Sequence, residues 1–109
     1  DTGMKKAIRY EHNTYAQKRT AEYLIEHAQS EELRELAGKI LLPQSVIRLF
    51  SLYAMRHDKA EYDDLLKDNN LIEILSGTQS INILMKKPEL FFKAMAVLHA
   101  PSLYYRLRS

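Results

Sequence analysis

The sequence predicts an all-α fold, a compact irregular bundle of five to seven short helices. Apolar residues recur at helical spacing in nearly every segment of the 109 residues. Only three prolines and three glycines interrupt these segments. Pro43, Pro88 and Pro101 each open a short apolar run, which suits the first position of a helix because the N–H of that residue has no partner there. We therefore expect helix over most of the chain and no β-sheet.

The first two helices are predicted on either side of Ser30. An apolar stripe ending at Leu24, Ile25 and Ala28 indicates a long first helix over about residues 5–28. Ser30 is a suitable N-cap for the second helix, since two glutamates follow it in the first turn, where the helix dipole favours negative charge. We expect Pro43 to end this second helix, because the residue before a proline is displaced from the helical region.

Two capping patterns mark the middle of the chain. A third helix over about residues 44–57 is apolar on two sides, which is typical of a central helix. Asp58 followed by Glu61 forms a capping box for a fourth helix. Asn70 followed by Glu73 repeats the pattern for a short fifth helix.

The last third of the chain is divided by Gly77 and the two later prolines. Residues 80–86 suit one or two helical turns or an extended linker, and residues 88–99 and 101–108 suit two further helices. We expect five large side chains to belong to the core. These are Phe50, Tyr53, Leu75, Phe91 and Met95.

The length is that of one domain, so residues 1–109 are predicted to form a single helical domain. Because the chain begins Asp1-Thr2-Gly3-Met4, we expect it to be a module of a larger protein. A solenoid-like fragment of helical repeats is the alternative fold. Pro43 and Pro88 lie 45 residues apart (88 − 43) and precede similar apolar runs, a spacing found in helical repeats.

The composition excludes several kinds of chemistry. There is no cysteine, and hence no disulfide, thiolate zinc site or cysteine nucleophile. The four histidines, His12, His27, His57 and His99, do not have the spacing of helical zinc ligands. No glycine-rich phosphate loop or Gly-x-Ser-x-Gly motif is present. We therefore predict no catalytic residue, no metal site, no cofactor and no small-molecule substrate, and expect the protein not to be an enzyme.

Charge is divided unevenly along a chain whose formal net charge is +2. Residues 58–73 carry six acids and two lysines, a local charge of −4. Residues 86–109 carry five cations and one glutamate, a local charge of +4. Such asymmetry is informative about partners rather than about fold.

Basic and aromatic residues are interleaved in the C-terminal segment, a mixture that suits an anionic partner. The candidate binding residues are Lys86, Lys87, Lys93, Tyr104, Tyr105, Arg106 and Arg108. A secondary basic face is predicted on the first helix. It consists of Lys5, Lys6 and Arg9.

Three functions are compatible with these features. We expect a non-enzymatic interaction module that binds another protein through a helical surface. The alternative is a peripheral module that binds anionic lipid headgroups of the phosphoinositide type through the basic–aromatic C-terminal surface. Nucleic-acid binding comes third, because the small net charge and acidic middle are weak for phosphate binding. The expected location is cytoplasmic, at a membrane surface if the lipid alternative holds.

Overall fold

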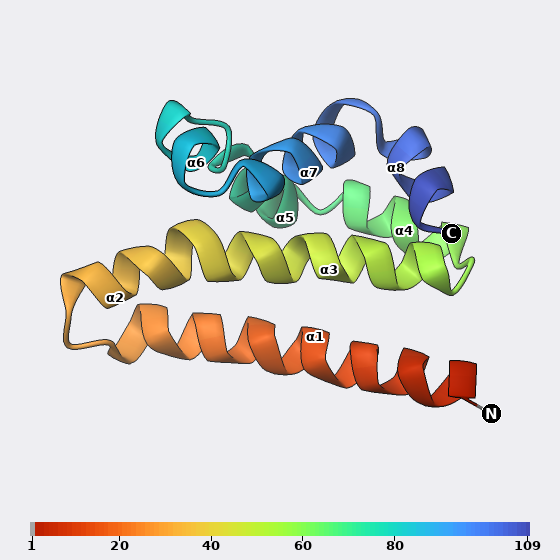
Figure 1. Ribbon diagram of the computed structural model, residues 1–109, viewed down its shortest axis with the longest axis horizontal. Helices are drawn as coiled ribbons and strands as arrows, with labels where there is room; N and C mark the ends of the chain where they lie inside the picture. The colour runs from red at the N-terminus through yellow and green to blue at the C-terminus, as the bar shows by residue number, and fades with distance from the viewer. Residues whose placement is uncertain (1) are drawn as a thin grey trace.

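A long helix lies in the middle of the molecule, with the first helix of the chain on one side of it and the later helices on the other (Figure 1). The computed structural model describes residues 2–109, with the side chains of Lys5, Lys6 and every residue from Ile8 onward. Within this range 86% of the chain is helical and no strand is found, as the sequence predicts. The elements are α1 (Thr2–His27), α2 (Glu31–Leu36), the π-helical segment η1 (Ala37–Leu41), α3 (Leu42–Met55), α4 (Lys59–Leu66), α5 (Asn69–Ser76), α6 (Ile81–Lys86), α7 (Pro88–His99) and α8 (Pro101–Arg108).

The prediction that Pro43 ends the second helix is wrong. α2, η1 and α3 follow one another without a break from Glu31 to Met55, and Pro43 is fully buried inside this helix. In an α-helix the proline ring would collide with the carbonyl four residues earlier. Here the preceding turn widens to π geometry, in which the Leu42 N–H donates to the Ala37 carbonyl. The widened turn makes room for the ring, so the helix continues.

Short polar side chains begin four of the helices. Ser30, Asp58 and Ser80 each accept a hydrogen bond from the backbone N–H three residues later, at 3.2–3.3 Å. The predicted cap at Asn70 is wrong. Asp68 caps α5 instead, because its carboxylate reaches two backbone N–H groups of the first turn.

Three layers result from this arrangement (Figure 1). α1 packs along one side of α2, η1 and α3, while α4, α5, α7 and α8 pack on the other side of α3. α6 packs on α7 in the outer layer. The main core lies between α3 and this outer layer. It consists of Val46, Ile47, Phe50, Ala54, Tyr62, Leu71, Leu75, Ile83, Leu90, Ala94, Val97 and Tyr104.

The core prediction is confirmed for two of its five residues. Phe50 and Leu75 are fully buried. Tyr53 and Phe91 are half-buried and pack against the core, and Met95 is half-buried outside it. α7 buries Leu90, Ala94 and Val97, so its inner face lies one residue away from the predicted one. The alternative fold of helical repeats is not supported, since Pro88 begins a helix whereas Pro43 lies inside one.

Polar side-chain contacts connect α1 and α3. The Tyr15 and Tyr53 hydroxyls are 3.0 Å apart, and Glu11 forms an ion pair with Arg56. The Tyr53 hydroxyl bonds to Tyr15, which raises the pKa of Tyr53 to about 12, and burial adds to this effect. Ala21 of α1 is buried, and so is Ala28, the residue that follows α1.

Candidate functional site

The predicted basic C-terminal residues do not form one surface. Lys86 and Lys87 lie at the junction of α6 and α7, and Lys93 lies in the second turn of α7, whereas Arg106 and Arg108 lie in the last turn of α8. α6 and α8 stand at opposite ends of the outer layer (Figure 1). α7 begins directly after Lys87, so its full length of 12 residues separates Lys86 and Lys87 from α8.

The two candidate tyrosines have structural roles. Tyr104 is buried, and its hydroxyl lies 2.7 Å from the Ser51 hydroxyl. Tyr105 is half-buried and meets the Tyr62 ring edge to face, with 4.9 Å between ring centroids. The Lys59 ammonium lies 5.4 Å from the centre of the Tyr105 ring. Tyr104 therefore presents almost no surface to a partner, and Tyr105 presents only part of its ring.

The secondary basic face on α1 is separate from both of these groups. Lys5, Lys6 and Arg9 are exposed near the start of α1. α1 lies across α3 from α6, α7 and α8 (Figure 1).

The acidic segment, residues 58–73, does not neutralise the C-terminal cations. Asp63 pairs with Lys59 at 2.6 Å, and over residues 2–109 no ion pair joins the acids of residues 58–73 to the cations of residues 86–108.

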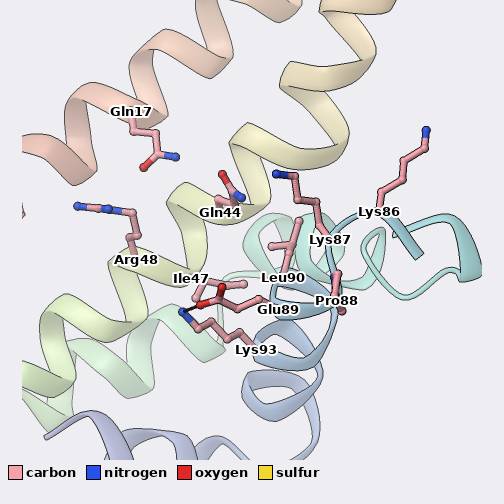
Figure 2. A pocket seen from close by; sticks show the side chains of 10 residues that line it. All are labelled: Gln17, Gln44, Ile47, Arg48, Lys86, Lys87, Pro88, Glu89, Leu90 and Lys93. Atoms are coloured by element: carbon pink, nitrogen blue, oxygen red, sulfur yellow. Dashed lines mark ion pairs between the residues drawn. The ribbon is translucent and has the colours of Figure 1, made fainter. Parts of the chain in front are cut away.

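Lys86, Lys87 and Lys93 line a recess between α1, α3 and the start of α7 (Figure 2). Its cavity volume is about 480 Å³. The sequence-predicted Lys86, Lys87 and Lys93 line it together with Arg48, and we call this recess the basic pocket. The remaining lining residues are Gln17, Gln44, Ile47, Pro88, Glu89 and Leu90.

Arg48 is the residue of this pocket that sequence reasoning missed. Its guanidinium lies 4.4 Å from the centre of the Tyr10 ring, and its Nε donates to the Thr14 hydroxyl at 3.5 Å. The available signal was that Arg48 is one of only two arginines in the apolar segment 44–57, and the other, Arg56, lies at its end. Helical periodicity placed it beside the buried face, but only the packing of α1 on α3 shows that this side borders a recess.

The three lysines of the basic pocket differ in orientation and in ion pairing (Figure 2). Lys87 turns toward Gln44 on α3, and Lys86 turns away from the other labelled side chains. Lys93 forms an ion pair with Glu89 at 2.7 Å, and the hydrogen bond from Lys93 lowers the pKa of Glu89. The single carboxylate of the pocket is thus already neutralised, which leaves the net charge of the lining positive.

The first turn of α7 adds to the positive potential. Pro88 and Glu89 belong to this turn, and no side chain caps it. The first N–H groups of a helix have no intrahelical partner, and the helix dipole is positive at this end. Together with the lysines, this turn favours an anionic group such as a carboxylate or a phosphate.

The described part of the chain contains neither a metal-binding cluster nor a helix that could cross a membrane. No group of three or more histidine, cysteine, aspartate or glutamate side chains in it is arranged to hold a metal ion. None of its helices combines the length and apolar character needed to cross a membrane.

Compared with known proteins, the chain matches no family model, no curated protein and no solved structure.

Proposed function

We propose that this chain is a non-enzymatic helical module that binds another protein, and that an acidic side chain of the partner enters the basic pocket. The observation that carries the proposal is the charge of the lining. The lining contains four cations, Arg48, Lys86, Lys87 and Lys93, and one carboxylate, Glu89, which Lys93 already neutralises. A partner carboxylate would gain charge-assisted hydrogen bonds there.

The shape of the site favours a protein side chain over an extended polyanion. The cations line a local recess, and the other two predicted basic groups, around Arg106 and around Lys5, lie elsewhere. A nucleic acid needs a continuous basic track along its backbone. A single acidic side chain needs only the local cluster.

The test is the affinity for a fluorescein-labelled glutamate-rich peptide, measured by fluorescence anisotropy at low salt. Reversing one charge near the ligand removes one attraction and adds one repulsion, so Lys87→Glu should weaken binding about tenfold. Lys67→Glu is the matched control, since Lys67 is an exposed lysine far along the chain from the pocket and the change in net charge is identical. Binding should weaken as salt rises.

Both variants should melt within a few degrees of the parent protein, because Lys67 and Lys87 are exposed. Equal weakening by the two variants would show a response to net charge alone, and would contradict a site at the basic pocket. Absence of peptide binding at low salt would contradict the proposal as well.

A membrane surface is the second candidate partner, and one observation favours it. Ile81 and Met85 lie one turn apart on α6 and are 68% and 77% exposed, directly before Lys86 and Lys87. Exposed apolar side chains beside cations suit the headgroup region of an anionic leaflet, such as the cytoplasmic leaflet. Co-sedimentation with phosphatidylcholine vesicles, with and without phosphatidylinositol 4,5-bisphosphate, tests this candidate. Met85→Gln should reduce sedimentation only if the membrane is the partner.

A further inference from the structure

A second and larger groove adjoins the basic pocket. It lies between α2 with η1 on one side and the α5–α6 connection with α6 on the other, and its cavity volume is about 750 Å³. Lys86 lines both recesses, so they meet at this residue. We call the larger recess the α2–α6 groove. Its lining is Ser30, Glu32, Leu33, Glu35, Leu36, Lys39, Ile40, Gly77, Ser80, Asn82, Ile83 and Lys86.

The apolar residues of the groove form a stripe along one wall. Leu33, Leu36 and Ile40 follow one another at helical spacing, and Ile83 of α6 lies across the groove. Leu33 and Leu36 are 39% and 42% exposed, and α2 contains no buried residue. The stripe therefore ends in the core at Ile40 and is open to solvent at Leu33.

Charge differs between the two ends of the groove. Glu32 and Glu35 lie on the α2 wall, while Lys86 lies at the junction with the basic pocket. Lys39 forms an ion pair with Glu35 at 3.8 Å, so these two charges offset each other. The remaining charges are Glu32 on α2, near the Leu33 end of the stripe, and Lys86 at the end that adjoins the basic pocket. An acidic group on an occupant is repelled near Glu32 and attracted near Lys86 and Lys87, which sets its orientation.

We propose that the partner segment is an amphipathic helix whose apolar side chains fill the α2–α6 groove and whose acidic end enters the basic pocket. The stripe from Leu33 to Ile40 spans eight residues, or about 10 Å of helix, and an occupant needs about two helical turns to match it. This inference rests on the proposed function and adds the class of ligand: apolar residues at i, i+3 or i+4 and i+7, followed by acids.

Two labelled peptides test the inference by fluorescence anisotropy. One is an amphipathic helical peptide with leucine at i, i+3 and i+7 and glutamates after them, and the other replaces each leucine with glutamine. The leucine peptide should bind the parent protein at least tenfold more tightly. Leu36→Gln should lower the affinity for the leucine peptide about tenfold, because burial of part of a leucine side chain is lost. The same variant should leave the glutamine peptide unaffected.

Tyr23→Gln is the matched control, since Tyr23 is a large exposed side chain on α1 outside both recesses. It should change neither affinity. Lys87→Glu should weaken both peptides. If Lys87→Glu weakens both but Leu36→Gln changes neither, the groove is not the apolar site and this inference fails while the proposed function stands. If neither variant has an effect, both fail.

Two other occupants would also overturn the inference. Sedimentation of the parent protein as a dimer that Leu36→Gln dissociates would identify a second copy of the chain in the groove. Vesicle binding that is lost in Leu36→Gln, with no preference for the leucine peptide, would identify a membrane. Circular dichroism of Leu36→Gln should match the parent, because this leucine is 42% exposed.

Discussion

Truncation of the Phe50 side chain to alanine tests the position of α3 at the centre of the fold. Phe50 is fully buried, and its ring meets the Tyr62 ring edge to face with 5.3 Å between centroids. Removing a buried ring forfeits its transfer free energy and leaves a cavity, so Phe50→Ala should lower the free energy of unfolding by about 3–5 kcal/mol. Because small domains have a total stability of about 5–15 kcal/mol, this is a large share.

Phe92→Ala is the matched control for this measurement. Phe92 also makes an edge contact at 5.3 Å, with Phe91, but it is 56% exposed. Its truncation should cost less than about 1 kcal/mol. The assay is urea unfolding followed by far-ultraviolet circular dichroism, with the denaturant slope compared between variants. A loss below about 1 kcal/mol for Phe50→Ala, or equal losses for the two variants, would refute the central position of α3.

Three further substitutions test local features of the fold. His57 has a positive φ of 57° after the last turn of α3, so His57→Gly should raise stability by up to about 1 kcal/mol in thermal melts, whereas a lower melting temperature would contradict a strained cap. The pKa of Tyr53 is about 12 in the folded chain, against about 10 when unfolded. The unfolded chain therefore releases this proton first, and stability present below pH about 10 declines as the pH rises toward 12. Tyr53→Phe should reduce that decline in urea titrations across this range, and an unchanged profile would refute the assignment. Ser51→Ala should cost about 1–3 kcal/mol, because it leaves the buried Tyr104 hydroxyl without its partner. Adding Tyr104→Phe should recover part of this loss, and additive losses would contradict the pairing.

Local signals determined the fold class and most helix boundaries. Pro88 and Pro101 begin α7 and α8 as predicted, and Ser30 and Asp58 cap α2 and α4. These features depend on one residue and its near neighbours. A missing N–H or a side-chain oxygen acts on the adjacent turn wherever the segment lies in the molecule. The absence of cysteine likewise excludes thiolate chemistry without any reference to tertiary structure.

Tertiary packing decided the features that depend on distant neighbours. Pro43 is buried inside a helix because a π turn accommodates its ring, an outcome that the local preference alone opposed. Tyr104 is part of the core and not of a surface because Ser51, which lies 53 residues away, meets its hydroxyl. The basic pocket combines Arg48 of α3 with Lys86, Lys87 and Lys93, which only the packing of the helices brings together. Arg106 and Arg108 lie outside it, in the last turn of α8. Sequence spacing reports which residues share a helix face, whereas the packing of separate helices decides which faces meet.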